Sequence, residues 1–211
     1  MDKENKSIDL TNDKLKSLIN SAIYELGKYG VEKASLNAIL KNSGSSKGFF
    51  YHYFESKEEL HKYILELALK LNYEVYEKRV IWEERDVLNR LILSMRMKVQ
   101  YLKEFPYIYR FIENIGLKEI KRSLKSLGYE STNEELEVKL YSKNVDRSLF
   151  REDVDESKLI NLANFAIMQI YEKYESAMQS DMMDIDSMLD EMEEYINFIK
   201  LGYYNTEEVY E

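Results

Sequence analysis

The chain has one proline and seven glycines among its 211 residues, so few positions interrupt a regular backbone. Proline and glycine are the two residues least compatible with the interior of a helix. The segments between them are rich in leucine, isoleucine, lysine and glutamate. Three of these four residues are good helix formers. This combination predicts an all-α protein.

Apolar residues recur every three to four positions along most of the chain, which is the period of an α-helix. Ser56 and Glu59 form a capping box, a pattern that opens a long helix. Pro106 marks a boundary, because proline suits the first turn of a helix but not its interior. Helical segments are expected over residues 15–26, 36–43, 47–53, from 56 onward, 86–104, 159–177 and 188–199.

Several classes of protein are excluded by what the sequence lacks. Without cysteine there is no disulfide scaffold, zinc-thiolate site or cysteine nucleophile. No stretch approaches the 18 uncharged apolar residues of a membrane-spanning helix, and the polar N-terminus lacks the apolar core of a signal peptide. No glycine-rich phosphate loop or hydrolase motif is present. We therefore expect a cytoplasmic protein that is not an enzyme, with no catalytic residue, metal, cofactor or membrane contact.

The charge of the chain is acidic, with 39 Asp and Glu against 30 Lys and Arg and a formal net charge of −9. Taken alone, this balance argues against a general polyanion binder, because Lys and Arg drive phosphate binding. The imbalance is uneven, since residues 1–60 carry nine of each sign and residues 61–211 carry 21 basic and 30 acidic residues. Any DNA binding by the N-terminal part would then use a few placed groups. This predicts weak non-specific binding and a shallow salt dependence.

Residues 35–60 have the outline of a helix-turn-helix, two short helices joined by a glycine-containing turn. In this motif the N-terminal residues of the second helix face base edges in the major groove. Phe50 and Phe54 lie on the opposite face, at positions i and i+4, and can anchor the helix in the core. The candidates for contact with bases are Ser46, Lys47, Gly48 and Phe49.

Three polar side chains flank the second helix. Tyr51, His52 and Lys57 project sideways, where a hydroxyl, an imidazole and an ammonium group can bind phosphate oxygens. Such contacts fix the register of a protein on DNA and do not read its sequence.

Residues 15–60 resemble the N-terminal domain of the TetR family of bacterial transcriptional regulators. The resemblance rests on a first amphipathic helix followed by Gly30, on Ser35, Ile39 and Gly44, and above all on Ser46-Lys47-Gly48 with Tyr51, Phe54, Lys57, Glu59 and Leu60. It implies a ligand-responsive repressor that binds a palindromic operator as a homodimer. It also implies phosphate contacts at the positions of Ser35, Tyr51, His52 and Lys57, and base proximity for Ser46, Lys47 and Phe49.

Three positions depart from the pattern of the family. Leu40 and Ser43 stand where a small alanine is usual, and Ser45 stands where an apolar residue is usual. A leucine at a close helix crossing must push the helices apart or find a gap. The tilt of the recognition helix, and with it the operator, therefore cannot be copied from relatives.

The predicted organisation has two domains, a three-helix helix-turn-helix DNA-binding domain over residues 1–56 and a helical bundle over residues 57–211. The second is expected to bind an effector and to dimerise. Methionine and aromatic residues, which make adaptable cavity walls, are dense in it. The resemblance implies a pocket for a small hydrophobic ligand there, although a filled core stays an alternative. The candidate lining residues are Trp82, Met97, Tyr101, Phe105, Tyr109, Phe165 and Met168.

The last two helices carry wide apolar stripes, which one helical hairpin cannot easily cover on its own. Pairing with a second copy would bury them in a four-helix interface. Burial within one chain is the alternative. The candidate interface residues are Leu162, Ala166, Ile170, Tyr174, Met188, Met192, Tyr195 and Ile199. An orphan helix-turn-helix regulator, controlled by a partner protein and without a small-molecule effector, is the alternative function.

Overall fold

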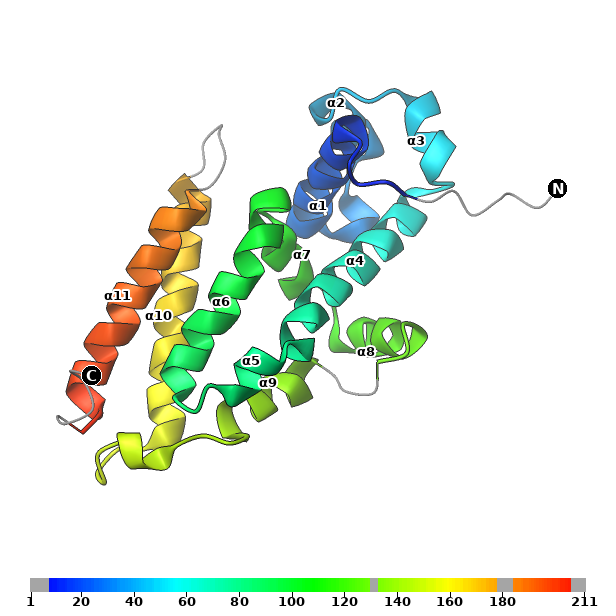
Figure 1. Cartoon of the computed structure of the whole chain (residues 1–211). Helices are drawn as coiled ribbons and strands as arrows, with labels where there is room; N and C mark the ends of the chain where they lie inside the picture. The colour runs from blue at the N-terminus through cyan, green and yellow to red at the C-terminus, as the bar shows by residue number, and fades with distance from the viewer. Residues whose placement is uncertain (1–7, 130–132, 178–183, 206–211) are drawn as a thin grey trace. The chain divides into compact units, whose positions relative to one another are not determined.

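The computed structural model describes residues 8–129, 133–177 and 184–205. Within these ranges the chain forms eleven α-helices and one short 3₁₀ helix. The only pairing of extended backbone in them is a single antiparallel bridge between Phe150 and Tyr204. The predicted all-α class is therefore confirmed (Figure 1).

The chain divides into two compact units. Unit 1 comprises Met1–Lys70 and Phe105–Glu130, and unit 2 comprises Leu71–Glu104 and Ser131–Glu211. Helix α4, Lys57–Glu77, begins in unit 1 and ends in unit 2. A domain boundary after residue 56 stays a prediction, but residues 105–130 pack with the N-terminal segment and not with the residues around them in sequence.

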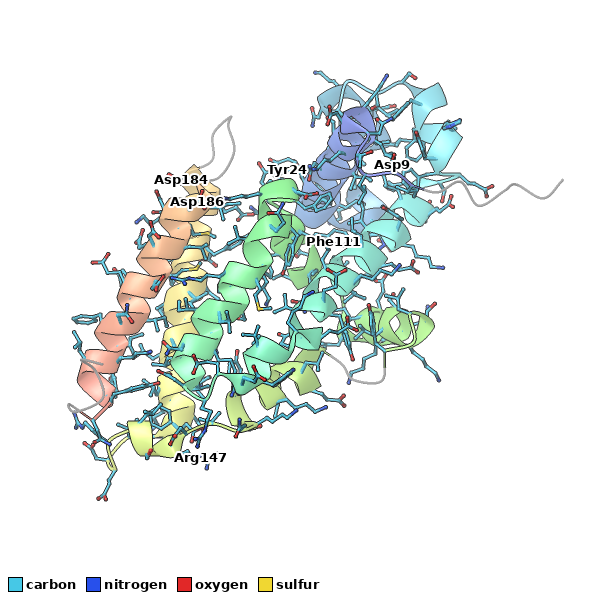
Figure 2. All side chains as sticks on the ribbon, viewed as in Figure 1. Asp9, Tyr24, Phe111, Arg147, Asp184 and Asp186 are labelled. Atoms are coloured by element: carbon cyan, nitrogen blue, oxygen red, sulfur yellow. The ribbon has the colours of Figure 1, made fainter. Side chains whose placement is uncertain are left out.

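Unit 1 is built around α1, which packs against both α2 and α7. One face of α1 is fully buried because its apolar residues repeat at helical spacing. Helix α7 approaches it closely at Gly27, where a Cβ atom would lie 3.2 Å from the backbone of Phe111. Tyr24 and Phe111 mark these two helices in Figure 2. Besides α4, the helices of unit 1 are α1 Asp13–Lys33, α2 Leu36–Asn42, α3 Lys47–Tyr53, α7 Ile108–Glu113 and α8 Leu117–Ser126.

The start of α4 confirms the predicted cap in part. The Ser56 hydroxyl accepts a hydrogen bond from the backbone N–H of Glu59 at 3.1 Å. The Glu59 carboxylate reaches back one residue further than a capping box requires and accepts from the N–H of Glu55. Both interactions satisfy amides at the beginning of the helix that would otherwise lack partners.

A buried histidine connects α4 to α7 and α8 inside unit 1. The His61 side chain is 7% exposed, and its ring centroid lies 5.4 Å from that of Phe111. Its Nδ1 atom is 3.6 Å from an Oε1 atom of Glu119. Burial lowers the pKa of His61, and the nearby carboxylates of Glu119 and Glu58 oppose this shift without cancelling it.

We expect acid to destabilise the protein through this residue. The unfolded chain protonates His61 at a higher pH than the folded chain does, because burial lowers the pKa in the folded state. The free energy of unfolding should therefore decrease as the pH falls through about 6.5, the pKa of an unperturbed histidine. Urea unfolding at pH 7.5 and 5.5 should show this loss in the wild type and a smaller one in His61→Gln. Equal losses in the two proteins would contradict the assignment.

Unit 2 has α6 at its centre, with α11 packed against both α6 and α10. The inward faces of α10 and α11 are apolar, with Ala163, Ile167, Met188 and Ile196 all buried. The helices that lie wholly in unit 2 are α5 Arg79–Glu83, α6 Val87–Glu104, α9 Asn133–Ser142, the 3₁₀ helix η1 Arg147–Leu149, α10 Glu156–Ala177 and α11 Ile185–Tyr203.

A fully buried arginine holds three segments of unit 2 together. Arg90, on α6, is 0% exposed. Its Nη1 atom donates to the carbonyl oxygens of Leu140 and Lys143, both at 2.8 Å, and its Nε atom donates to that of Glu84 at 2.9 Å. The carbonyls of Leu140 and Lys143 lie at the C-terminal end of α9, where intrahelical donors are missing.

A second polar cluster ties the end of α11 to the start of α6. The Asp86 carboxylate accepts from the Lys200 ammonium at 2.7 Å and from the Tyr204 hydroxyl at 2.5 Å. It also caps α6 by accepting from the N–H of Leu88 at 2.9 Å. Burial and the Asp86 charge raise the pKa of Tyr204, so the phenol stays protonated and donates.

Candidate functional site

Helix α3 begins at an exposed and well-capped N-terminus. The Ser46 hydroxyl accepts a hydrogen bond from the N–H of Phe49 at 3.1 Å, which fixes the first turn. Ser46, Lys47 and Gly48 are all exposed. A Cβ atom at Gly48 would meet only the Ser46 hydroxyl within 4 Å, at 3.9 Å, so packing does not require glycine there. The missing side chain instead leaves the backbone open to a ligand.

The opposite face of α3 is anchored in the core, as the sequence predicts. Phe50 is 0% exposed and Phe54 is 2% exposed, and their ring centroids lie 5.9 Å apart. Tyr51 and His52 are exposed, although the Tyr51 ring lies 5.0 Å from that of Phe50 and the His52 ring lies 4.8 Å from that of Tyr53. The helix therefore presents polar groups outward from a rigid aromatic base.

Phe49 is less exposed to solvent than the other three candidates for base contact. It is half-buried, and its ring packs edge-on against Tyr53 at 5.2 Å. The ammonium group of Lys14, from the first turn of α1, lies 4.7 Å above the ring centroid. This is a cation–π contact. Lys14 is thereby placed beside the recognition helix, although nothing in its sequence position indicated this.

The candidate phosphate-binding residues Ser35 and Lys57 meet around the end of α1. The Ser35 hydroxyl caps α2 by accepting from the N–H of Ala38 at 3.3 Å. The Lys57 ammonium donates to the carbonyl oxygens of Ala34 at 2.8 Å and Glu32 at 3.4 Å. An ammonium group has three donors, so one remains for an external acceptor.

The comparisons with known proteins converge on one family. The profile described as "Bacterial regulatory proteins, tetR family" matches residues 18–64. An uncharacterised HTH-type transcriptional regulator of Bacillus subtilis, YvdT, is 38% identical over 50 residues, which are 24% of this chain and 26% of that protein. The match thus spans about a quarter of the length of this curated relative.

Over residues 18–64 the chain matches the TetR family. Members of this family are DNA-binding transcriptional regulators and not enzymes. The sequence match covers α2, α3 and the parts of α1 and α4 that flank them, so it carries the helix-turn-helix.

Solved structures extend the likeness in fold to nearly the whole of this chain. The ketosteroid transcriptional regulator KstR2 of Mycobacterium tuberculosis aligns with a TM-score of 0.59 and 16% identity, covering 89% of this chain and 93% of that one. A TetR family regulator from Chloroflexus aurantiacus aligns with a TM-score of 0.55 and 14% identity, covering 95% and 97%. At these identities the alignments show a shared fold alone.

The three departures from the family pattern lie on α2 and in the turn that follows it. Leu40 is buried at 6% exposure. The Ser43 hydroxyl donates to the carbonyl of Ile39 at 2.8 Å, which closes the last turn of α2. The Ser45 hydroxyl is buried without a hydrogen-bond partner in the part of the chain that the structure describes. Such a group costs stability where an apolar residue would not.

The candidate effector-binding residues fall in both units of the chain. Phe105 and Tyr109 belong to unit 1, whereas Trp82, Met97 and Tyr101 belong to unit 2. Phe165 and Met168 are 63% and 51% exposed on α10, whereas Ala163 and Ile167 of the same helix are buried. Phe165 lines the groove described below, and the role of both residues in effector binding stays a prediction.

The candidate interface residues separate into two groups on α10 and α11. Met188 and Met192 are 2% and 1% exposed, so they are buried within their own chain, and this corrects the predicted set. Leu162 and Tyr195 are 40% and 48% exposed. Tyr174 is half-buried, and Ala166, Ile170 and Ile199 line the groove described next.

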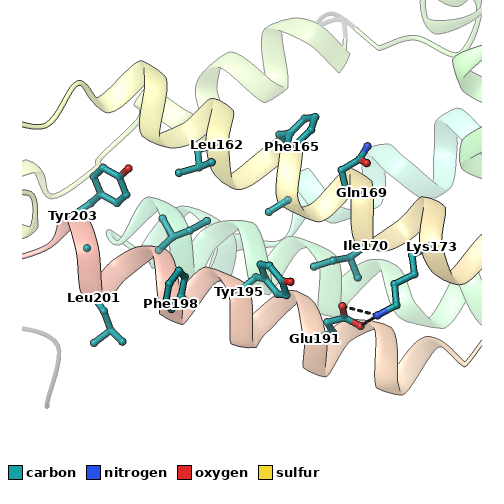
Figure 3. A pocket seen from close by; sticks show the side chains of 13 residues that line it. Leu162, Phe165, Gln169, Ile170, Lys173, Glu191, Tyr195, Phe198, Leu201 and Tyr203 are labelled. Atoms are coloured by element: carbon teal, nitrogen blue, oxygen red, sulfur yellow. Dashed lines mark hydrogen bonds and ion pairs between the residues drawn. The ribbon is translucent and has the colours of Figure 1, made fainter.

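An apolar groove of about 720 Å³ runs along the outer faces of α10 and α11 (Figure 3). An ion pair between Lys173 and Glu191, with Nζ 2.7 Å from Oε2, bounds one end of it. Phe198 is 73% exposed and Leu201 is 57% exposed, and both line the groove although the prediction omitted them. Phe198 lies three residues after Tyr195, a same-face spacing on a helix that could have found it.

Two properties of the described residues limit other kinds of site. No group of three or more His, Asp or Glu side chains among them is placed to hold a metal ion. None of the described helices combines the length and the apolar character needed to cross a membrane.

Proposed function

We propose that this protein is a transcriptional repressor that binds a palindromic operator as a homodimer and is released by a small molecule. The observation that carries the proposal is the exposed, capped N-terminus of α3. Ser46, Lys47 and Gly48 are exposed there, while Phe50 and Phe54 anchor the helix in the core. Such a helix enters the major groove with its first residues at base edges. A regulator of this kind acts in the cytoplasm, where the bacterial chromosome is.

The outer groove of α10 and α11 supports the homodimer. An apolar face that includes Leu162, Phe165, Tyr195 and Phe198 is costly to leave in water. A second copy presents the same two helices, so a two-fold axis would bury both faces in one four-helix interface. This arrangement also supplies the two recognition helices that a palindromic operator requires, about 34 Å apart or a multiple of that distance.

Release by a small molecule would act on this spacing. In one conformation of the dimer the separation of the recognition helices fits the operator, and in another it does not. A ligand that binds the second conformation more tightly than the first would shift the population away from the DNA-binding form. Helix α4 is suited to transmit the shift because it begins in unit 1 and ends in unit 2.

Selection of bound fragments from a random DNA pool tests the proposal. The selected fragments should share a two-fold symmetric sequence with half-sites one helical turn or a multiple apart. Recovery of no enriched sequence, together with no binding to the region around its own gene, would contradict it.

Substitution of two lysines separates reading of bases from holding of phosphates. Lys47→Ala should relax sequence preference, because each contact with a base is worth ~1–3 kcal/mol. Lys57→Ala should weaken binding to selected and random DNA alike. Lys62→Ala, an exposed lysine one turn further along α4, is the matched control and should bind as the wild type does. Binding of both test variants at wild-type strength would refute the assignment of α3 as recognition helix.

A further inference from the structure

Helix α8 carries a row of cations along one face. Lys118, Lys121, Arg122 and Lys125 occupy positions i, i+3, i+4 and i+7, which fall within about 100° of one another on an α-helix. All four side chains are exposed. Over the residues that the structure describes, none of the four is paired with a carboxylate. We call these four residues the α8 stripe.

The remaining residues of α8 attach the helix to unit 1. Leu124 is 2% exposed and Ile120 is half-buried, on the face opposite the α8 stripe. Glu119 sits beside His61 of α4, with Oε1 3.6 Å from Nδ1. The α8 stripe is thus fixed to the unit that contains the recognition helix, and its four charged side chains are exposed to solvent.

The α8 stripe changes the electrostatics of unit 1. The segments that form unit 1 contain 16 Lys and Arg against 13 Asp and Glu, whereas those of unit 2 contain 14 against 26. The acidic balance of the chain therefore belongs to unit 2 alone. Unit 1 is net positive, and most of its excess comes from the segment that carries α8, since residues 1–70 hold 11 basic and 10 acidic residues and residues 105–130 hold five and three.

We propose that the α8 stripe binds the phosphate backbone of the DNA that flanks the operator. This inference rests on the proposed function. The α8 stripe is about 10 Å long, and phosphates follow one another every ~3.4 Å along the axis of each DNA strand. The row of cations can therefore lie along a row of consecutive phosphates. His61, which lies beside Glu119 at the start of α8, is one helical turn along α4 from Lys57, or about 6 Å. The α8 stripe thus continues the predicted phosphate contacts away from the recognition helix.

An anionic membrane fits the same charges less well. A helix that lies on a membrane inserts its apolar face among the lipids. In α8 that face is already buried at Leu124, and of its apolar side chains Leu117 is the one that is largely exposed, at 64%. The charged face is what remains available, which suits a polyanion and not a bilayer.

The test removes the four charges of the α8 stripe together and compares two DNA lengths. The probes are a duplex that ends at the selected operator and one extended by about 20 base pairs on each side. A matched control removes four exposed cations of unit 2, so both proteins change net charge by the same amount. The test variant is Lys118→Gln, Lys121→Gln, Arg122→Gln and Lys125→Gln, and the control variant is Arg85→Gln, Arg96→Gln, Arg147→Gln and Lys158→Gln.

The test variant should bind the extended duplex about tenfold more weakly at 0.1 M salt, with a log–log salt slope shallower by about 0.9 for each phosphate that the α8 stripe no longer neutralises. Binding to the short duplex should change by less than about threefold, and the control variant should resemble the wild type on both. Circular dichroism checks that each variant is folded, which is expected because only exposed side chains change.

A salt slope on the extended duplex that is the same in the test variant and the wild type overturns the inference. In that case the operator binding of the wild type keeps the proposed function intact, and an acidic protein segment becomes the candidate partner of the α8 stripe. Failure of the wild type to bind either duplex contradicts the proposed function and the inference together.

Discussion

Arg90→Ala is expected to lower the free energy of unfolding by about 4 kcal/mol, the largest loss that a single substitution in this chain should cause. The change removes a fully buried side chain and leaves the carbonyl oxygens of Glu84, Leu140 and Lys143 without the donor that satisfies them. Hydrogen bonds from a charged donor are worth ~1.5–3 kcal/mol each, and the vacated volume adds a cavity cost. Urea unfolding followed by circular dichroism measures the loss.

Two further variants show whether the guanidinium geometry is responsible. Arg90→Lys keeps the charge but cannot donate from a planar fork to carbonyls on two sides, so it should recover less than half of the loss. Arg85→Ala removes an arginine that is 60% exposed and pairs with Asp146, and it should cost less than about 1 kcal/mol. A loss below about 1 kcal/mol for Arg90→Ala would show that other donors, or water, replace the arginine.

Phe198→Glu is expected to raise the dissociation constant of the homodimer at least ~100-fold, which corresponds to about 2.7 kcal/mol. Phe198 is the most exposed of the large apolar side chains in the groove of α10 and α11, at 73%. A carboxylate there would be buried without a partner if two copies met across this face. Light scattering across a dilution series measures the change, and operator binding should weaken in parallel.

Val138→Glu is the matched control for the homodimer. Val138 belongs to α9, is 61% exposed and does not line the groove. Its substitution adds the same charge to unit 2 and should leave dimerisation unchanged. Equal dissociation of the two variants would point to a general charge effect, and unchanged dimerisation of Phe198→Glu would place the interface elsewhere.

The local part of the candidate site was predictable from the sequence because neighbouring residues decide it. The cap at Ser46 and the anchors Phe50 and Phe54 depend on spacings of three and four residues, which the geometry of a helix sets. The long helix that opens at Ser56 follows from the same kind of reasoning.

The distant parts were not predictable, because they depend on which helices pack together. The apolar stripes of α10 and α11 are wide enough to serve two surfaces, and periodicity does not tell which residues face inward. Packing of α11 against α6 turned Met188 and Met192 inward and left Phe198 outside. Lys14 came to lie over Phe49 only through the tertiary folding of unit 1.

The amino-acid sequence by itself determined the all-α class, the helix-turn-helix and the exposed start of its recognition helix, because each rests on contacts within a few residues. Tertiary structure alone decided which charges surround that helix. The net charge of −9 on the whole chain argued against DNA binding, and the zero net charge of residues 1–60 only weakened that argument. Folding brought residues 105–130, with the α8 stripe, into the same unit as the recognition helix and made that unit more positive. Electrostatic potential depends on distance in space and not on separation along the chain.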